Sequence, residues 1–352
     1  MIKSNAILEI SKKNLINNYK YFNKLSNNNI CAVTIKSDGY GLGSNQIFKL
    51  LYDKGCKYFF VATVQEGISL RKKFKKGVIY ILNGKENNSY KIFKKYSLIP
   101  ILSNLYDYYR FKKKSIKFGI QINTGINRLG IDYNDHDKIS YNNAYLNIVI
   151  SHLASAEEIV NPYNKVQLNK FEKIVNSYKK HIIIFSLANS FGSVLSNKYL
   201  FDMIRPGISI YGGHFNNPLL KRNIKPVVKL KAKILQIKQL NKNEFVGYNQ
   251  TYKTKKEQWI AIIGIGYGDG LKRILSNKGK VYLNNKKFDI IGRVSMDSII
   301  VDIKNSIPMF KKEKYVEIIN HKYGIDNLAN NCNTISHEIL TSLNKRVERK
   351  FV

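Results

Sequence analysis

The sequence predicts an α/β chain in which a (β/α)8 barrel is followed by a mostly β C-terminal domain. Over the first 212 residues, eight short runs of β-branched and aromatic residues alternate with helix-like segments. Such alternation is typical of a parallel sheet, and a count of eight favours a closed TIM-type barrel. After that point the segments become strands joined by turns, which indicates a second domain of a different kind.

The eight predicted barrel strands follow one another along the chain with helix-like segments between them. Their ranges are 31–36, 57–63, 77–84, 98–103, 117–123, 146–154, 182–190 and 203–212. The segment 44–55 begins with serine and ends with glycine, as helices often do. Apolar residues recur at helical spacing in the segment 163–178. Both segments are therefore predicted as helices of the barrel.

The domain boundary is predicted near residue 220. The segment 212–226 is expected to be a linker, which gives a barrel domain at 1–220 and a β-rich C-terminal domain at 221–352. One further strand, at 5–13, precedes the barrel and is a candidate to pair with the C-terminal domain.

Composition excludes several classes of protein. The formal net charge is +35, but the chain carries nine arginines and fifty lysines spread along its whole length. Scattered charge indicates a solvated surface, so nucleic acid is not expected as a partner. No 18-residue apolar run could span a membrane. No export signal is found at the N-terminus, and three cysteines without metal-type spacing predict a cytoplasmic protein without disulfides or a metal.

In a (β/α)8 barrel, catalytic groups lie at the C-terminal ends of the strands, and phosphate often binds after strands 7 and 8. The predicted strand ends carry Lys36, Thr63, Asn83, Ser103, Asn123, His152, Asn189, Ser190, Arg205 and Gly207. A lone lysine at a strand end is more often only solvated. Combined with small and hydroxyl residues after strands 7 and 8, Lys36 suits a phosphate-bearing aldehyde cofactor held as a Schiff base.

These residues lie in segments that resemble one family. The stretch AVTIKSDGYGLG (32–43) is similar to the lysine motif of alanine racemases, which are pyridoxal 5'-phosphate enzymes built from a barrel and a β domain. Eight further segments, in family order, extend the resemblance over nearly the whole chain: 122–130, 151–158, 187–193, 203–212, 246–252, 265–270, 292–297 and 346–352. The resemblance implies a homodimer with shared active sites. It also implies interconversion of L-alanine and D-alanine through an external aldimine, which supplies D-alanine for peptidoglycan.

The resemblance assigns two catalytic bases. Lys36 would carry the cofactor and act on one face of the substrate Cα, and Tyr248 of the other subunit would act on the opposite face. Racemisation needs both, because one base returning its proton to the same face changes nothing. A phenol is a poor base at its normal pKa, so positive charge from His152 and Arg205 is expected to assist Tyr248.

The resemblance also implies a cofactor site and a substrate site. Arg205 would face the pyridine nitrogen, and a guanidinium there leaves that nitrogen unprotonated. The cofactor-binding residues would be Lys36, Tyr40, His152, Asn189, Ser190, Arg205, Gly207, Ile208 and His337. The substrate carboxylate would meet Arg128 and the backbone amide of Met296 from the partner chain. Residues lining the access corridor would be Tyr267, Arg273, Arg293 and Asp297.

Four positions depart from the family pattern. Gln121 replaces a lysine that is often carbamylated, and its amide oxygen could hold Arg128 instead. His337 stands where a tyrosine usually contacts the phosphate, Ser295 where a cysteine is common, and Ser186 where a histidine is common. None of these changes removes a proton-transfer group.

Other functions stay open at this point. A racemase of broader specificity is one alternative, because His337 and Ser295 are expected on the substrate side. A non-catalytic pyridoxal-phosphate-binding protein is another, although such a carrier has no use for Tyr248. A decarboxylase with a barrel and a β domain is disfavoured, since such enzymes place an acidic residue where Arg205 stands.

Overall fold

The computed structural model describes residues 4–84, 90–178 and 183–352. These residues fall into two compact units, which we call the barrel unit and the β unit. The barrel unit comprises Ile16–Ile210 and Asn216–Ile224, and the β unit comprises the chain up to Leu15, Tyr211–Phe215 and Lys225–Val352. Residue 182, where the seventh strand is predicted to start, and residues 1–3 of the predicted first domain lie outside the described residues.

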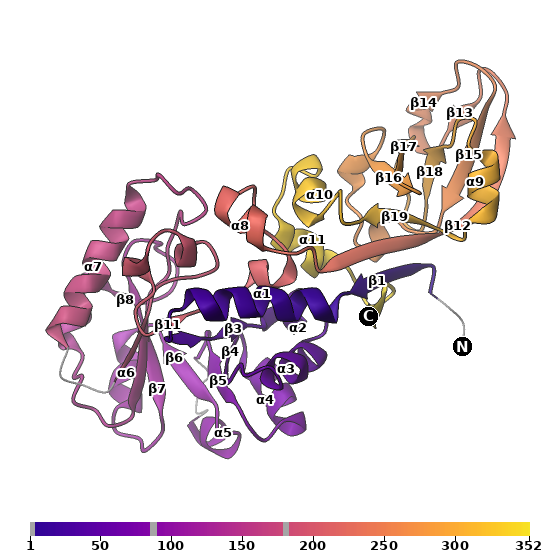
Figure 1. The fold of residues 1–352 in the computed structure, drawn as a ribbon. Coiled ribbons are helices and arrows are strands. Elements are labelled where there is room, and N and C mark those ends of the chain that lie inside the picture. Colours follow the sequence, from indigo (N-terminus) through magenta and orange to yellow (C-terminus); the bar gives the residue numbers. More distant parts are fainter. Residues whose placement is uncertain (1–3, 85–89, 179–182) are drawn as a thin grey trace. The chain divides into compact units, whose positions relative to one another are not determined.

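Parallel strands close the barrel unit (Figure 1). In chain order they are β2 (Ile30–Cys31) with β3 (Val33–Thr34), β4 (Tyr58–Val61), β5 (Val78–Ile81), β6 (Ile99–Leu102), β7 (Phe118–Asn123), β9 (Leu146–Ile150), β10 (Ile184–Ser186) and β11 (Met203–Ile204). Strands β2 and β3 form one barrel strand interrupted at Ala32. Strands β3 to β10 pair in sequence, and β11 pairs with β2. Backbone hydrogen bonds from Asp202 N to Phe185 O and from Arg205 N to Ala188 O join β10 to β11, so the predicted eight-stranded barrel is confirmed.

The barrel strands are apolar because both of their faces are covered. Side chains from several strands fill the interior, and this cluster consists of Ala32, Phe60, Tyr80, Ile99, Ile101, Ile148, Ile150 and Met203. The rings of Phe60 and Tyr80 stack with their centroids 4.6 Å apart. Tyr80 is fully buried, and its hydroxyl donates a hydrogen bond to Asn147 Oδ1 at 2.7 Å. The barrel therefore has a solid floor beneath the strand ends.

The helices of the chain up to residue 224 alternate with these strands. They are α1 (Lys12–Leu25), α2 (Lys36–Tyr40), α3 (Ser44–Tyr52), α4 (Val64–Lys73), α5 (Tyr90–Lys95), α6 (Leu105–Phe111), α7 (Tyr163–Ser177) and α8 (Pro218–Asn223). Short 3-10 helices are η1 (Tyr133–Lys138), η2 (Gly192–Val194), η3 (Asn197–Tyr199) and η4 (Ile208–Tyr211), and the short strand β8 (Ile131–Asp132) pairs with β7. Helices α3 and α7 occupy the two segments predicted to be helical.

The segment predicted as a linker contains a helix instead. Helix α8 lies within it, and its start is capped by Asn217, whose Oδ1 accepts hydrogen bonds from Leu219 N and Leu220 N at 3.1 Å. Pro218 occupies the start of the helix, where a missing N–H costs nothing. An Asn-Pro pair followed by leucines was thus a helix start rather than a turn.

The β unit is built around one twisted sheet. Its strands, in spatial order, are β15 (Gln258–Ile263), β18 (Ile299–Asp302), β17 (Lys286–Ile291), β16 (Lys280–Leu283), β19 (Tyr315–Ile319), β12 (Val228–Leu240), β1 (Ala6–Ile10) and β20 (Glu348–Phe351). Strand β12 pairs with both β15 and β19, which closes six of the strands into a ring. Strand β1 runs antiparallel to β12 and parallel to β20. The first strand of the chain therefore belongs to this sheet and not to the barrel.

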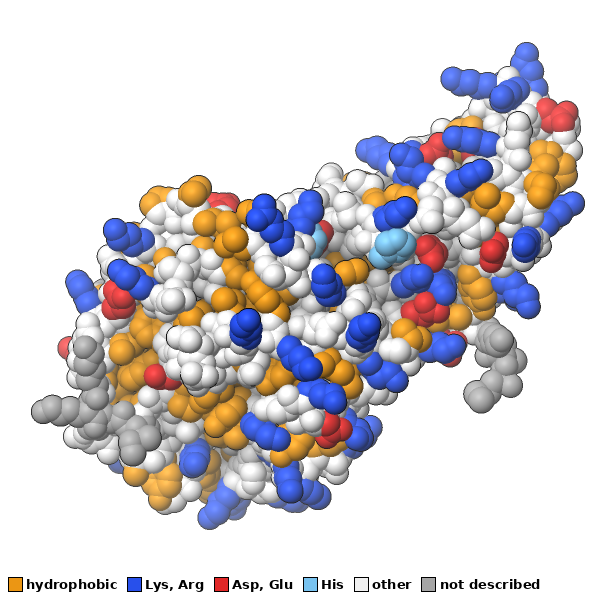
Figure 2. Space-filling view, in the orientation of Figure 1, with side chains coloured by type: hydrophobic (Ala, Val, Ile, Leu, Met, Phe, Trp, Pro, Cys, Tyr) orange, Lys and Arg blue, Asp and Glu red, His pale blue; other side chains and the backbone are white. Residues whose placement is uncertain are grey.

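The β unit also contains a hairpin and several short helices outside that sheet. They are the hairpin β13 (Phe245–Val246) and β14 (Tyr252–Lys253), the helices α9 (Ile307–Lys312), α10 (Ile325–Asn331) and α11 (Ser336–Ser342), and the 3-10 helices η5 (Tyr248–Gln250), η6 (Tyr267–Asp269) and η7 (Arg273–Leu275). None of the helices in the described residues is long and apolar enough to cross a lipid bilayer. Figure 2 shows lysine and arginine side chains scattered over the visible face instead of gathered in one patch.

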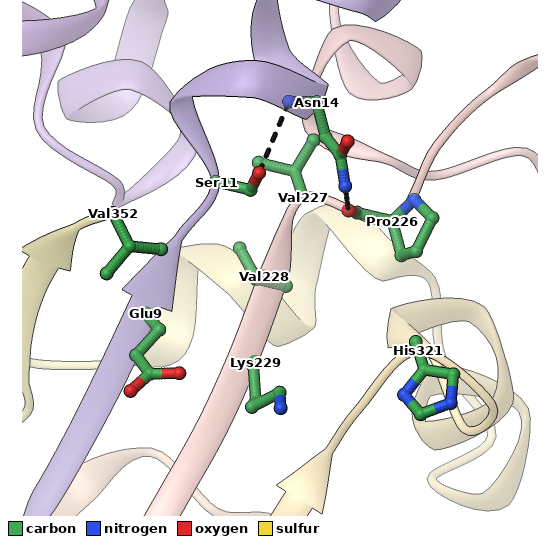
Figure 3. A pocket seen from close by; sticks show the side chains of 9 residues that line it. All are labelled: Glu9, Ser11, Asn14, Pro226, Val227, Val228, Lys229, His321 and Val352. Atoms are coloured by element: carbon green, nitrogen blue, oxygen red, sulfur yellow. Dashed lines mark hydrogen bonds between the residues drawn. The ribbon is translucent and has the colours of Figure 1, made fainter.

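One cavity, of about 300 Å³, lies within the β unit (Figure 3). It is lined by Glu9, Ser11, Asn14, Pro226, Val227, Val228, Lys229, His321 and Val352. At its edge Asn14 Nδ2 donates to Pro226 O at 2.7 Å, and Asn14 N donates to Ser11 Oγ at 3.2 Å. None of the residues predicted for the active site lines this cavity.

Candidate active site

Lys36 begins α2 and is separated from β3 by Ile35, so it lies just past the C-terminal end of the first barrel strand. The turn that follows it is left-handed, with φ of 51° at Ser37, 52° at Asp38, 63° at Gly39 and 57° at Tyr40. Burial is the main cause that lowers the pKa of the Lys36 amine; Arg128 lowers it further, while the Glu66 carboxylate opposes both. A lower pKa leaves more of the amine neutral, and the neutral amine is the form that attacks a carbonyl.

A buried polar cradle lies after strands β10 and β11. The Ser190 hydroxyl accepts hydrogen bonds from Gly207 N at 2.9 Å and from Ser209 N at 3.4 Å. A Cβ at Gly207 would collide with the Tyr40 hydroxyl, so only glycine lets the backbone approach Tyr40 this closely. Ile208 begins η4 between these residues and is buried. The turn after Lys36 and the loops after strands 7 and 8 therefore meet at one place.

Arg205 is held on the floor of the barrel mouth. One guanidinium nitrogen donates to Ser186 Oγ and another to the carbonyl of Ser151 at 2.6 Å, while the guanidinium carbon lies 5.8 Å from the centroid of Phe60. Arg205 is 6% exposed, and burial lowers the pKa of its guanidinium to about 9. It is therefore still a cation at neutral pH, and the partners just named are all neutral.

The Ser186 hydroxyl donates a hydrogen bond to Met203 O at 2.5 Å. Because its one proton is used there, the hydroxyl oxygen acts as the acceptor toward Arg205. His152 follows Ser151 at the end of β9, and its carbonyl accepts from Gln167 Nε2 at 2.9 Å. Asn189 shapes the next loop, because its Oδ1 accepts from Phe191 N and Gly192 N. These residues come from strands 6 and 7 of the barrel.

Arg128 lies on the exposed loop between β7 and β8. Gln121 holds this loop from below by donating from Nε2 to Leu129 O at 2.7 Å. On the outer side, the Tyr163 hydroxyl donates to Gly125 O at 3.0 Å. The positive charge of Arg128 lowers the pKa of Lys36. Gln121 thus contacts the backbone beside Arg128 through its nitrogen.

The remaining predicted residues lie in the β unit. Tyr248 occupies the turn of the β13–β14 hairpin and is 67% exposed, and Met296 is 52% exposed. Their loops are packed side by side with neighbouring ones, since a Cβ at Gly247 would contact Arg293 N at 3.3 Å and Gly268 N donates to Met296 O at 2.8 Å. The loop of Tyr248 thus approaches the backbone of Arg293, three residues before Met296 in the chain.

Other corridor and cofactor candidates are also placed in the β unit. Arg346 binds both Asp269, at 3.1 Å, and Asp297, at 2.7 Å, and so ties Asp297 to the loop of Tyr267. His337 lies on α11, where its ring stacks on Phe215 with the centroids 5.6 Å apart. Arg273 begins η7.

Three residues belong to the site although the sequence did not predict a role for them. Ser186, noted only as a departure, anchors Arg205. Ser209 is fully buried beside Ser190, and within the described residues its Oγ has no hydrogen-bond partner. Glu66 reaches the amide that follows Lys36. Only Glu66 carried a sequence signal, because Thr63 and Glu66 have the spacing of a helix capping box.

Comparisons with known proteins place this architecture in a family. The model of the alanine racemase N-terminal domain matches residues 10–215, and that of the alanine racemase C-terminal domain matches residues 227–351. An alanine racemase of Rickettsia canadensis (strain McKiel) is 38% identical over 98% of this chain and 98% of its own. The alanine racemase of Bartonella henselae, solved with covalently bound pyridoxal phosphate, has a TM-score of 0.92 at 33% identity, over 99% of this chain and 100% of that one.

The alanine racemase of Acinetobacter baumannii has a TM-score of 0.90 at 25% identity, over 99% of this chain and all of that one. These likenesses extend over both units and agree with the resemblance that the segments around Lys36 and Arg205 carry. The chain belongs to the alanine racemase family.

Proposed function

We propose that the protein is a pyridoxal-phosphate-dependent alanine racemase, an isomerase that interconverts L-alanine and D-alanine. The observation that carries this proposal is the meeting, at one barrel mouth, of a lysine of lowered pKa with the buried cradle around Ser190 and the buried cation Arg205. The family membership supports the same reaction.

The residues of the barrel mouth fit pyridoxal phosphate. Only glycine fits at position 207, so the backbone there can contact a phosphate closely. Arg205 is a buried cation with neutral hydrogen-bond partners, an arrangement that an anionic group would stabilise. We assign cofactor binding to Lys36, Tyr40, His152, Asn189, Ser190, Arg205, Gly207, Ile208 and His337, and substrate-carboxylate binding to Arg128 and Met296.

Bound pyridoxal phosphate supplies an aldehyde that links to amines and a ring that withdraws electrons from the substrate Cα. Lys36 Nζ takes or returns the Cα proton on one face, and the phenol oxygen of Tyr248 does so on the other. Arg205 would face the ring nitrogen of the bound cofactor and would keep its own proton, because a guanidinium is a very weak acid. Arg128 orients the substrate through its carboxylate.

The assembly that this mechanism needs is a homodimer with shared sites, in which the domain at 221–352 completes the site in the partner's barrel domain at 1–220. The exposure of Tyr248 and Met296, two large side chains of the β unit, supports it. The same proposal places the enzyme in the cytoplasm, where it supplies D-alanine for peptidoglycan.

Borohydride reduction of the holoenzyme, followed by peptide mapping, tests the central assignment. We expect the reduced cofactor to be attached to Lys36, because this lysine lies beside the cradle and has the lowered pKa. A label on another lysine would contradict the proposed function. Assaying Cα deuterium exchange on a panel of L- and D-amino acids in the same preparation distinguishes an alanine-specific enzyme from a broader racemase.

Ser186→Ala should remove a hydrogen bond that holds Arg205 and thereby weaken the binding of the cofactor. Loss of one hydrogen bond to a charged group corresponds to about 1.5 kcal/mol, or about a tenfold weaker affinity for the cofactor. The measurement is a cofactor titration followed by visible absorbance. Ser151→Ala is the matched control, because Arg205 contacts the carbonyl of Ser151 while the side chain binds Ile122 O at 2.7 Å. Equal affinities in the two variants would show that Ser186 does not anchor Arg205.

A further inference from the structure

The turn after Lys36 is conformationally expensive. Four consecutive residues, 37–40, have positive φ, and three of them are not glycine. A left-handed helical conformation costs a non-glycine residue about 1–2 kcal/mol. Such a segment persists only where the surrounding structure fixes it. Because the turn joins Lys36 to Tyr40, its geometry decides where both side chains enter the barrel mouth.

The downstream half of the turn is fixed from within. Asp38 Oδ1 accepts hydrogen bonds from the backbone N and the hydroxyl of Ser44, both at 2.8 Å. The Asp38 carbonyl accepts from Gly43 N at 2.8 Å. These bonds lie on the side away from Lys36, so they do not fix the peptide that directly follows the lysine.

The upstream half is closed by a backbone hydrogen bond from Gly39 N to Ile35 O at 2.8 Å, and it is also held by Glu66, a residue of α4. Its Oε1 accepts from Ser37 N at 2.5 Å, and its Oε2 accepts from Ala62 N at 2.7 Å and Thr63 N at 3.1 Å. The carboxylate therefore bridges the C-terminal ends of the first and second barrel strands. A helix cap needs only one of these oxygens, and the other is directed at the residue next to Lys36.

The charge of Glu66 also acts on the lysine. Within the described residues, Glu66 from α4 and Arg128 from the β7–β8 loop are the charged groups that shift the pKa of Lys36, in opposite directions. Glu66 thus contacts the amide that follows Lys36, and its negative charge raises the pKa of the lysine.

We propose that Glu66 is a positioning residue for Lys36: its carboxylate fixes the left-handed turn and thereby orients the lysine amine at the barrel mouth. The proposal rests on the proposed function in one respect, which is that Lys36 carries the cofactor. Glu66 does not take part in proton transfer. It acts through the backbone of Ser37.

Glu66→Gln tests this with little change in shape. A glutamine has one accepting oxygen, and its NH2 group cannot accept, so it cannot serve both Ser37 N and the cap at Ala62 and Thr63. Thr63→Ala is the matched control, because it removes the hydroxyl that caps α4 through Glu66 N at 3.3 Å and leaves the carboxylate in place. If Glu66→Gln does not fold, Glu66→Asp keeps the charge but is too short to bridge both strand ends.

Three measurements on the holoenzymes decide the question. We expect Glu66→Gln to accelerate hydrogen–deuterium exchange in the peptide covering residues 36–43 and to accelerate release of the cofactor by hydroxylamine. We expect kcat to fall about tenfold to a hundredfold with a smaller change in KM, as for a misplaced catalytic group. Thr63→Ala should lower the melting temperature without these effects.

The outcomes separate this proposal from the proposed function. Equal exchange in the 36–43 peptide of both variants would show that Glu66 is only a helix cap and would overturn the proposal alone. A borohydride label on a lysine other than Lys36 in the unmodified protein would overturn the proposed function and this proposal with it.

Discussion

Tyr248→Phe should nearly abolish racemisation while the cofactor stays bound. The phenol oxygen is the only atom removed, and loss of a general acid–base group lowers kcat by about a hundredfold to ten-thousandfold. In D2O, the variant should still exchange the Cα hydrogen of the enantiomer that presents it to Lys36, but without inversion. Chiral chromatography of alanine together with mass spectrometry measures both quantities in one sample.

Tyr252→Phe is the control for that experiment. Tyr252 lies in β14 of the same hairpin, and its hydroxyl donates to Gln258 Oε1 at 3.2 Å instead of facing solvent. It should racemise alanine at the rate of the unmodified protein. If Tyr248→Phe also keeps full activity, the second base is another group, and the two-base assignment is wrong.

Arg71→Ala should be among the most destabilising substitutions in the barrel unit. Arg71 is 8% exposed, and its guanidinium donates to six backbone carbonyls, those of Phe74, Lys75, Lys76, Gly77, Tyr96 and Ser97. These carbonyls lie in the two segments that follow α4 and α5, so the guanidinium joins the chain after one helix to the chain after the other. We expect the free energy of unfolding to fall by about 3–5 kcal/mol, measured by urea denaturation.

Two further variants test whether the loss of stability comes from the many hydrogen bonds of Arg71. Arg71→Lys keeps the charge, but an ammonium has three donors at one point and cannot reach carbonyls on two helix ends, so it should recover only part of the loss. Arg110→Ala removes an exposed arginine whose bond goes to the Tyr106 hydroxyl, and it should change stability by less than about 0.5 kcal/mol. A small effect of Arg71→Ala would mean that water replaces the guanidinium at these carbonyls.

The barrel was predictable because its strands are buried on both faces and therefore read as short apolar runs between helices. The same rule placed Lys36 at a strand end before any family was considered. Helix α8 was not predictable in the same way, because its start depends on the Asn217 side chain folding back onto the backbone. In a sequence, Asn-Pro favours the start of a turn.

The site was predictable where residue type alone sets the chemistry, as at Lys36 and Arg205. The role of a residue was not predictable where it depends on which side-chain atoms contact each other across the barrel. Ser186 looked like a lost histidine until its hydroxyl was seen against the guanidinium of Arg205. The spacing of Thr63 and Glu66 is typical of a helix capping box, and nothing in that pattern indicates that the second oxygen of Glu66 reaches Ser37, 29 residues away in the chain.

Strand β1 is synthesised long before the two strands with which it pairs. Its two neighbours, β12 and β20, are translated only after the last barrel strand. On the ribosome, the barrel strands can all have emerged while β1 still exposes two unpaired edges, one of them waiting for Glu348–Phe351 at the far end of the chain. The nascent chain therefore depends on residues 348–351 to complete a sheet that residues 6–10 begin. Premature termination is expected to leave an aggregation-prone strand edge instead of a smaller folded enzyme.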